Sequence, residues 1–384
     1  MMKAIINIAK YFITWIKQFR IHRQFDLDYS FAKSLLNKME LPELTKDEIS
    51  DITAYWGRKG IIFPDYTWFQ LFYGITQIHS PLFIPQPIAY AVIQKGNNQE
   101  MIPGWDDKNI YEILIPTVVF PNTYCHYIHN VYYDKDWNII DTKSKGLNNI
   151  AEIIIKCCRK DNSFILKRTS NTGCGRGVRK FVFKDKADII DILQSLPSNE
   201  DYIIQESIRQ HSMLAKFNKS SVNILRVLTY RCEENIEVLS VSFRFGIDGQ
   251  YTDVAFKDGQ EIVNVVGVDI EKGIFKNKLF DTNGEKPYTL PDGVNGEKIP
   301  GLEKVIEMAK SGHKRLFHFN FVGWDFTIDE FEQPICIEYN IKSPGVMLYQ
   351  FANGPLAGAL TDKFLEALSD KQVRRQIPRH FRCS

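Results

Sequence analysis

Apolar and polar residues alternate in two neighbouring stretches towards the C-terminal end of the chain. These stretches are Trp324–Ile328 and Ile335–Asn340, both rich in β-branched and aromatic residues, and the polar segment 329–334 separates them. Such a pattern predicts two strands joined in a β-hairpin. Because the apolar side chains fall at alternate positions, we expect one face of the hairpin to pack on a core and the other to border a cleft.

The expected register of this hairpin brings acidic residues together. If Ile328 pairs with Ile335, Asp325 lies directly opposite Glu338, with their Cβ atoms about 5 Å apart. Asn340 lies two residues beyond Glu338 and therefore projects from the same face of its strand. Opposed carboxylates repel each other unless a cation lies between them, and Mg²⁺ prefers oxygen ligands of this kind. We interpret the three residues as a metal site, with a solvated polar face as the alternative.

Further strands and helices are expected in the middle of the chain, where polar turns separate them. The expected strands are 164–168, 178–183, 202–205, 222–230 and 238–245, and the expected helices are 149–158, 186–196, 301–314 and 356–368. Strand-rich lobes with interspersed helices are typical of α+β proteins rather than of alternating βα units. The basic segment Lys371–Arg382 is expected to be a solvated end.

The N-terminal part of the chain has a mainly helical pattern. Helices are expected over 31–39 and 46–55, and a short strand over Ala89–Ile93. At 384 residues the chain exceeds one typical core. We divide it into a helical region (1–104), a linking segment of the core (105–160), a small lobe with a glycine loop (161–210) and a large lobe with the hairpin (211–384).

Residues 3–23 form an amphipathic pattern at helical spacing. The apolar stripe consists of Ile5, Ile8, Phe12, Ile16 and Phe19, and the basic positions on the opposite side are Lys3, Lys10 and Lys17. The segment is too short and too often interrupted by polar residues to span a bilayer. It is expected either to pack on the body of the protein or to lie on an anionic membrane surface.

Composition and charge narrow the classes of function. The hydrophobic fraction of 44% and the aromatic fraction of 13% describe a well-packed globular protein. A formal charge of +2 argues against a dedicated nucleic-acid-binding protein. The seven cysteines include no Cys-x-x-Cys pair, which indicates a reduced, cytoplasmic protein. The inner face of the membrane is the alternative location if residues 3–23 dock there.

A glycine-rich loop joins two of the expected strands. It covers residues 170–177, lacks the Gly-Lys-Ser/Thr ending of a P-loop and precedes a strand, so it is not a Rossmann turn. Glycine allows backbone N–H groups to approach phosphates closely. Lys167 lies on the strand just before the loop, where its ammonium can meet a phosphate. We interpret the loop as nucleotide-binding, with a plain turn as the alternative.

Other residues have the chemistry of a nucleotide cleft. Gln205 and Glu206 end an apolar strand, where the edge backbone could pair with an adenine and Glu206 could meet its amino group or the ribose. Arg226 and Arg244 lie within apolar strands, where an unpaired guanidinium is costly. Each arginine therefore needs an anion. We favour a phosphate or a substrate carboxylate, with an internal carboxylate as the alternative.

The order of these motifs resembles the ATP-grasp superfamily and, within it, the sugar-transfer-associated ATP-grasp family of bacterial surface-polysaccharide gene clusters. The resembling segments are 107–108, 165–178, 202–211, 221–230, 243–246, 323–326 and 337–345. One departure is that Asp253 is followed by Val254, where the family pattern has Asn. A role for Asp253 therefore stays open.

The resemblance implies ATP held between two α+β lobes of an ATP-grasp fold, with the helical N-terminal region as a lead-in. It also implies one or two Mg²⁺ ions on Asp325, Glu338 and Asn340. The residues implied to bind the nucleotide are Lys108, Lys167, Gly173, Gly175, Arg176, Gly177, Gln205, Glu206 and Ile208. Those implied to act in catalysis, by neutralising charge during phosphoryl transfer, are Lys167, Arg226 and Arg244.

Most relatives activate a carboxylate as an acyl phosphate, which an amine then attacks. The resemblance therefore implies an ATP-dependent ligase that joins a small-molecule or sugar-linked carboxylate to an amine, in polysaccharide or glycoconjugate biosynthesis. One alternative is a kinase of similar fold that phosphorylates a sugar or a lipid-linked hydroxyl. Another is a non-catalytic nucleotide-binding scaffold associated with glycosyltransferases at the membrane, although the intact set of Asp325, Glu338 and Asn340 argues against a scaffold.

Overall fold

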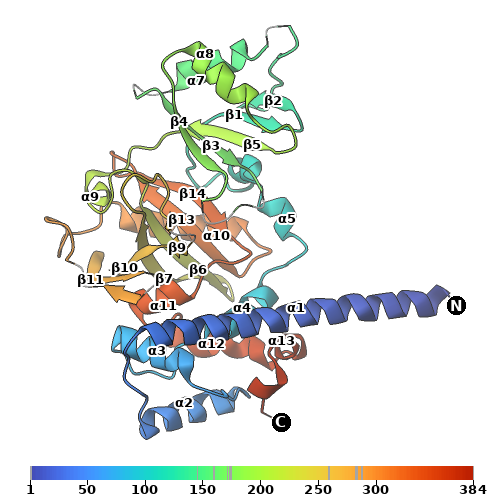
Figure 1. Ribbon diagram of the computed structural model, residues 1–384, viewed down its shortest axis with the longest axis vertical. Coiled ribbons are helices and arrows are strands. Elements are labelled where there is room, and N and C mark those ends of the chain that lie inside the picture. The colour runs from blue at the N-terminus through green and yellow to red at the C-terminus, as the bar shows by residue number, and fades with distance from the viewer. Residues whose placement is uncertain are drawn as a thin grey trace.

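Two antiparallel sheets and a group of helices follow one another along the longest axis of the molecule (Figure 1). The computed structural model describes residues 2–144, 146–158, 161–170, 172, 175–257, 260–281, 284–286 and 289–383. Within this part of the chain, side chains are described except at residues 2–18, 255–257, 260–261 and 284–286.

The five-stranded sheet at the top of Figure 1 has the strand order β2-β1-β5-β3-β4. Its strands are β1 (Thr123–Ile128), β2 (Val131–Asp134), β3 (Ser163–Arg168), β4 (Val178–Val182) and β5 (Tyr202–Glu206). Helices α7 (Asn148–Cys157) and α8 (Lys186–Gln194) cover one face and share a core with Phe164. Side chains alternate along β3, so Ile165 and Lys167 lie on the opposite face from Phe164, towards the large sheet.

This small sheet is larger than the sequence indicates. Its strands β1 and β2 fall within residues 105–160, the segment assigned to a link. The sheet therefore extends over residues 123–206, beyond the range 161–210 given to the small lobe. Strand β1 was not predicted because its sequence mixes polar and aromatic residues without alternation. All but one of its side chains are buried, on both faces of the sheet, so no polar face marks the strand.

The seven-stranded sheet has the order β12-β11-β10-β7-β6-β13-β14. Its strands are β6 (Ile224–Cys232), β7 (Asn235–Phe245), β10 (Asn264–Asp269), β11 (Ile274–Asp281), β12 (Gly284–Lys286), β13 (Phe321–Ile328) and β14 (Pro334–Asn340). Helix α10 (Leu302–Arg315) shares a core with Val227 on one face, and α11 (Met347–Asn353) shares a core with Leu228 on the other. A separate pair, β8 (Ala255–Lys257) and β9 (Gln260–Ile262), precedes β10.

The predicted hairpin is present as β13 and β14. Asp325 lies opposite Glu338, as the sequence predicts. Towards the turn the predicted register is wrong, because Ile328 pairs with Pro334 rather than with Ile335. A β-bulge next to Asp325 absorbs this difference of one residue. The carboxylates are therefore opposed in spite of the slip nearer the turn.

The helical part of the molecule combines both ends of the chain in one core. Its helices are α1 (Met2–Lys38), α2 (Lys46–Arg58), α3 (Thr67–Thr76), α4 (Gln86–Gly96), α12 (Thr361–Leu365) and α13 (Lys371–Gln376). The short helices η2 (Gly358–Leu360), η3 (Glu366–Ser369) and η4 (Arg379–Phe381) belong to the same core. Short helices elsewhere in the chain are α5 (Ile102–Trp105), η1 (Lys108–Ile110), α6 (Tyr111–Leu114) and α9 (Ser212–Ala215).

Two sequence-based expectations fail in this helical core. The strand predicted over Ala89–Ile93 is instead part of helix α4. Pro87 lies in the first turn of this helix, where proline is well tolerated, and the buried positions of α4 follow helical spacing. The segment Lys371–Arg382 is not simply a solvated end, because Val373 and Phe381 are buried. Both predictions were wrong for the same reason: the apolar residues of α4 and of the C-terminal segment pack against each other and against α1.

A buried asparagine fixes this helical core to the large sheet. Asn97, directly after α4, donates from Nδ2 to the carbonyl oxygens of Phe321 (2.8 Å) and Ile341 (2.7 Å). Its Oδ1 accepts a hydrogen bond from the Phe321 backbone N–H at 2.9 Å. The side chain thereby joins α4 to the start of β13 and to the residue that follows β14.

We expect the Asn97→Ala variant to lose about 3 kcal/mol of unfolding free energy, because three buried backbone groups lose their partner. Chemical denaturation measures the change. The neighbouring Asn98 is exposed and bonds only the nearby Glu100 N–H, so Asn98→Ala is the matched control. Equal losses in both variants would contradict this role of Asn97.

Candidate functional site

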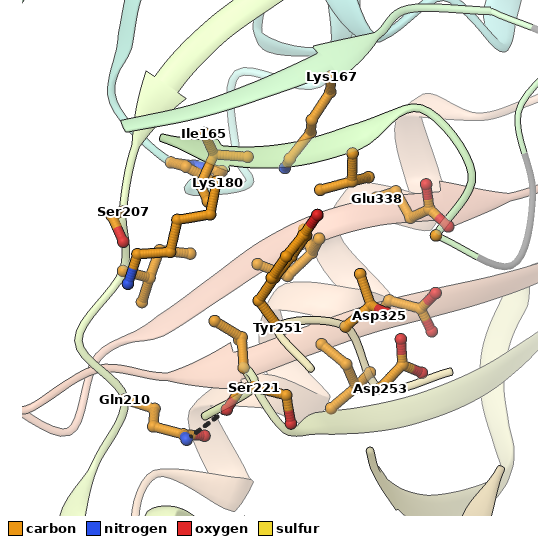
Figure 2. A pocket seen from close by; sticks show the side chains of 18 of the residues that line it. Ile165, Lys167, Lys180, Ser207, Gln210, Ser221, Tyr251, Asp253, Asp325 and Glu338 are labelled. Carbon is orange, nitrogen blue, oxygen red and sulfur yellow. Dashed lines mark hydrogen bonds between the residues drawn. The ribbon is translucent and has the colours of Figure 1, made fainter. Parts of the chain in front are cut away.

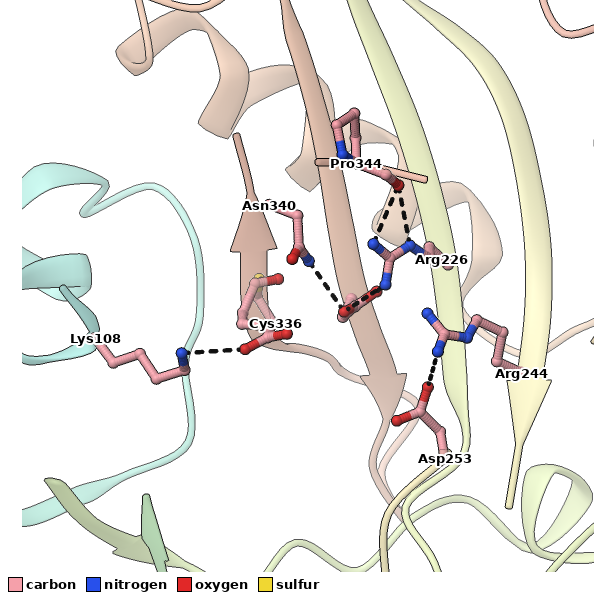
Figure 3. A network of polar contacts seen from close by, with 9 residues as sticks. Lys108, Arg226, Arg244, Asp253, Cys336, Asn340 and Pro344 are labelled. Carbon is pink, nitrogen blue, oxygen red and sulfur yellow. Dashed lines mark hydrogen bonds and ion pairs between the residues drawn. The ribbon is translucent and has the colours of Figure 1, made fainter. Parts of the chain in front are cut away.

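A buried ion pair lies at the centre of the large sheet. Arg226 on β6 and Asp325 on β13 are register partners, and Nη1 of Arg226 is 3.1 Å from both carboxylate oxygens of Asp325 (Figure 3). Nε and Nη2 of Arg226 also donate to the Pro344 carbonyl, at 3.3 and 3.1 Å. The guanidinium is therefore held by both the carboxylate and the backbone.

The second carboxylate has its own cation. Oε2 of Glu338 lies 3.3 Å from Nζ of Lys108, which reaches it from the other side of the cleft (Figure 3). Asn340 donates from Nδ2 to Asp325 at 3.2 Å, so all three predicted metal-binding residues converge. Asp325, Glu338 and Asn340 thus form one polar cluster, and Arg226 and Lys108 contact it from two sides.

Burial and charge act in opposite directions on the two carboxyl groups. Burial raises the pKa of Asp325 to about 6, although the charge of Arg226 works against this shift. Burial also acts on Glu338, but Lys108 and Arg226 together lower the pKa of that carboxyl below its ordinary value. An additional cation next to Asp325 would therefore stabilise its ionised form.

A cavity of about 370 Å³ lies between the two sheets. Ile165, Lys167 and Lys180 of the small sheet border it on one side, and Ser221 and Tyr251 border it on the other (Figure 2). We call it the first cavity. The carboxylates Asp325 and Glu338 lie at one end of it.

A second cavity of about 430 Å³ begins at the same carboxylates. Its own lining includes Arg226, Arg244 and Lys342, together with Tyr90 of α4 and Tyr349 of α11. The residues that border both cavities are Lys108, Thr172, Gly175, Asp253, Asp325 and Glu338. The two carboxylates therefore stand where the first cavity meets the second.

Both arginines predicted to need an anion have an internal carboxylate, which is the alternative and not the favoured interpretation. Arg226 pairs with Asp325, and Nη2 of Arg244 lies 3.1 Å from Oδ2 of Asp253 (Figure 3). The partner of Arg244 is the aspartate whose role the sequence left open. The Nε of Arg244 is buried and makes no hydrogen bond with a described residue.

Two buried lysines face the carboxylates from the small-sheet side. Lys108 also donates to the Thr172 hydroxyl at 3.1 Å. Lys167 lies on β3, where burial lowers the pKa of its ammonium to about 8, with Glu338 partly opposing that shift and Lys108 adding to it. Lys167 is therefore a cation whose charge changes near neutral to mildly alkaline pH.

The predicted glycine loop is described only in part. Gly173 and Cys174 lie outside the described residues. Gly175 and Gly177 have positive φ angles of 70° and 79°, a region that favours glycine. Gly175 and Arg176 border the first cavity.

The residues at the end of β5 and just after it divide between the core and the cavity. Gln205 points away from the first cavity and donates to the Pro121 carbonyl and the Thr123 hydroxyl, both at 3.2 Å. Glu206 and Ile208 border the cavity, and Oε1 of Glu206 accepts the Asn122 backbone N–H at 3.0 Å. Of the three predicted nucleotide-binding side chains, Gln205 is therefore committed elsewhere.

Sequence reasoning missed several residues of the two cavities. Lys180 lies opposite Ile165 in the β3–β4 pair and shares the face of Lys167, so strand alternation could have identified it. Tyr90 could not be identified, because its helix was assigned to a strand. Asp106 borders the second cavity, where burial raises the pKa of its carboxyl to about 6.

The donor set fits magnesium bound together with phosphates better than a metal held by protein alone. No group of three or more His, Cys, Asp or Glu side chains that could hold a metal occurs in the part of the chain that the structure describes. Asp325 and Glu338 provide two carboxylates, and Asn340 adds an amide oxygen. Mg²⁺ commonly takes one or two carboxylates and completes its shell with substrate phosphates and water.

Comparison with protein families finds one match, a family described as sugar-transfer associated ATP-grasp, over residues 89–364. Comparison with curated proteins finds no match. Among solved structures, the ATP-grasp ligase PsnB in complex with a minimal precursor is 12% identical (70% of this chain, 63% of that chain, TM-score 0.40). The VanG D-Ala:D-Ser ligase from Enterococcus faecalis is also 12% identical (71% and 62%, TM-score 0.40). The chain thus spans less than two thirds of either protein.

We expect nucleotide affinity to depend on the protonation of Lys167. Phosphates bind the ammonium form, which is complete below the pKa of about 8 and is lost as the pH rises through it. ATP binding measured by calorimetry should therefore weaken roughly tenfold between pH 7 and pH 9.

The matched control is Lys167→Arg, in which the side chain stays charged over this range. Its affinity should change little with pH. An equal pH dependence in both proteins would show that another group is responsible.

Proposed function

The chain belongs to the sugar-transfer associated ATP-grasp family, and from this premise we propose that it is an ATP-dependent ligase. It would activate a carboxylate as an acyl phosphate for attack by an amine. The family description supports a role in bacterial polysaccharide or glycoconjugate biosynthesis. The observation that carries the proposal is the position of Asp325 and Glu338 at the junction of two cavities.

The first cavity would hold ATP. It is bordered by Glu206 and Ile208, which suit the adenosine, and by Lys167 and Lys180, which suit the phosphates. The loop residue Arg176 adds a further cation on the same side. A triphosphate directed from Glu206 towards Lys108 would end beside the two carboxylates.

The second cavity would hold the acceptor. Three cations, Arg226, Arg244 and Lys342, border this cavity and not the first one. An acceptor carboxylate would be attracted by this group of cations and turned towards the junction. Their positions support a carboxylate as the group that receives the phosphoryl group.

The reaction then needs alignment and charge neutralisation. An oxygen of the acceptor carboxylate attacks the γ-phosphorus, the bond to the β,γ-bridging oxygen breaks, and ADP leaves. The amine nitrogen next attacks the acyl carbon, phosphate leaves, and a proton is released. Arg244 and Lys108 would stabilise the charge on the transferred group, and Asp106 could accept the proton. Mg²⁺ bound at Asp325, Glu338 and Asn340 would neutralise the phosphates.

A hydroxylamine trap tests this proposal. Hydroxylamine replaces the natural amine and converts an acyl phosphate into a hydroxamate, which gives a coloured complex with added Fe³⁺. We expect ADP and hydroxamate to form together when the protein, ATP and Mg²⁺ are mixed with a panel of uronic and amino acids. A stable phosphorylated hydroxyl product that needs no amine would identify a kinase instead, and binding of ATP without any turnover would favour a scaffold.

The Glu338→Gln variant should lower ADP formation by about 100-fold or more, because an oxygen ligand with a full charge is lost. Glu338 is preferred to Asp325 for this test, since its side chain is 27% exposed and its replacement disturbs the core less. Glu234→Gln, at an exposed site on the β6–β7 turn, is the matched control and should keep full activity. Similar rates in the two variants would contradict the role of Glu338.

A further inference from the structure

Helix α1 extends well beyond the part of the protein that it packs on. Its 37 residues correspond to about 55 Å of helix. The side chains of Phe25, Tyr29 and Leu35 are buried, whereas Phe19 is 56% exposed. Figure 1 shows the N-terminal half of α1 projecting past the other helices. Among the described side chains of α1, those buried in the helical core therefore lie in its second half.

The projecting half has an unusual charge pattern. Residues 1–25 contain five Lys or Arg residues and no Asp or Glu. Their apolar residues include Ile5, Phe12, Trp15 and Ile16. None of the helices in the described part of the chain is long and apolar enough to cross a membrane. A basic helix with this many apolar residues suits the interface of a bilayer rather than its interior.

The C-terminal segment brings a second set of basic residues to the same helix. Nε2 of His22 lies 3.0 Å from the carbonyl oxygen of Arg375. The ring of Phe381 packs against the rings of Phe25 and Tyr29, with distances of 4.8 and 4.7 Å between ring centroids. Residues 371–384 also contain five Lys or Arg residues and no Asp or Glu. The C-terminal segment is thus fixed next to the middle of α1, where the projecting half begins.

The basic residues of this C-terminal segment are close enough to affect one another. Burial lowers the pKa of Arg382, and the charges of Arg379 and Arg374 lower it further. The positive charge is therefore concentrated at one end of the molecule.

The rest of the chain has the opposite balance. Outside these two segments it carries 38 Lys and Arg residues against 46 Asp and Glu residues. The formal charge of +2 therefore conceals a protein that is acidic over most of its length and strongly basic at one place. Such asymmetry points to a negatively charged partner at that place.

We propose that residues 2–23 of α1 and residues 371–382 together dock the protein on an anionic lipid surface. The apolar residues of α1 would enter the headgroup region, and the basic residues of both segments would pair with acidic headgroups. Lipid is favoured over nucleic acid because Ile and Phe residues of a helix gain free energy in a bilayer interface but have no partner on a phosphate backbone. The surface is separate from both cavities.

Docking would also place the acceptor side of the cleft near lipid. Helix α4 packs against both α1 and α13, and it supplies Gln86 and Tyr90 to the second cavity. An acceptor carried on a lipid would therefore meet the protein on the side where the second cavity is walled by α4.

Vesicle flotation with the full-length protein tests the proposal. We expect binding to vesicles of phosphatidylcholine mixed with phosphatidylglycerol, little binding to phosphatidylcholine alone, and loss of binding as salt is raised. Lys10→Glu/Lys17→Glu and Arg375→Glu/Arg379→Glu should each weaken binding at least tenfold.

Lys156→Glu/Lys184→Glu makes the same change of charge on exposed lysines of the small lobe, and it should bind like the unaltered protein. Circular dichroism confirms that each variant is folded. Equal binding to both vesicle types would overturn the proposal, and so would an equal loss of binding in the control variant. It would also be overturned if the charge-reversal variants lost self-association or duplex-DNA binding but still bound vesicles.

Discussion

The ion pair between Arg226 and Asp325 is the interaction on which the site depends. It joins the neighbouring strands β6 and β13 of the large sheet, and its charges are almost completely withdrawn from water. Breaking such a pair by removing one partner costs about 3–5 kcal/mol, since the other charge stays buried and unpaired. Because Glu338 lies opposite Asp325, the strand pairing also concentrates negative charge at this point. The cations Arg226 and Lys108 balance it.

Each part of the molecule contributes a different kind of group to this point. The small sheet supplies Lys167 and Lys180 to the first cavity, and the large sheet supplies Arg226 and Arg244 to the second. The helical core supplies the wall formed by α4, which Asn97 ties to both strands of the hairpin region. The family match begins inside α4, so the helices α1, α2 and α3 of this core lie outside the matched residues.

Local patterns in the sequence were sufficient for the hairpin, the α+β class and the strands around the glycine loop. They could not predict contacts between distant segments. Arg226 and Asp325 are separated by 99 residues, so the sequence could say only that Arg226 needs an anion. The register slip near Ile328 arises from the turn, where Asp329 accepts hydrogen bonds from the N–H groups of Phe331 and Gln333. The hydrogen bonds of the Gln205 side chain could not be predicted, because its partners Pro121 and Thr123 lie on a segment that gave no strand signal.

The most direct measurement is a crystal structure with a non-hydrolysable ATP analogue and Mn²⁺, located by its anomalous scattering. The account predicts a manganese peak between Asp325 and Glu338, in contact with the terminal phosphate of a nucleotide whose adenine lies near Glu206. The second cavity should remain open for an acceptor. A nucleotide in the second cavity, or a metal peak away from both carboxylates, would contradict the central claim.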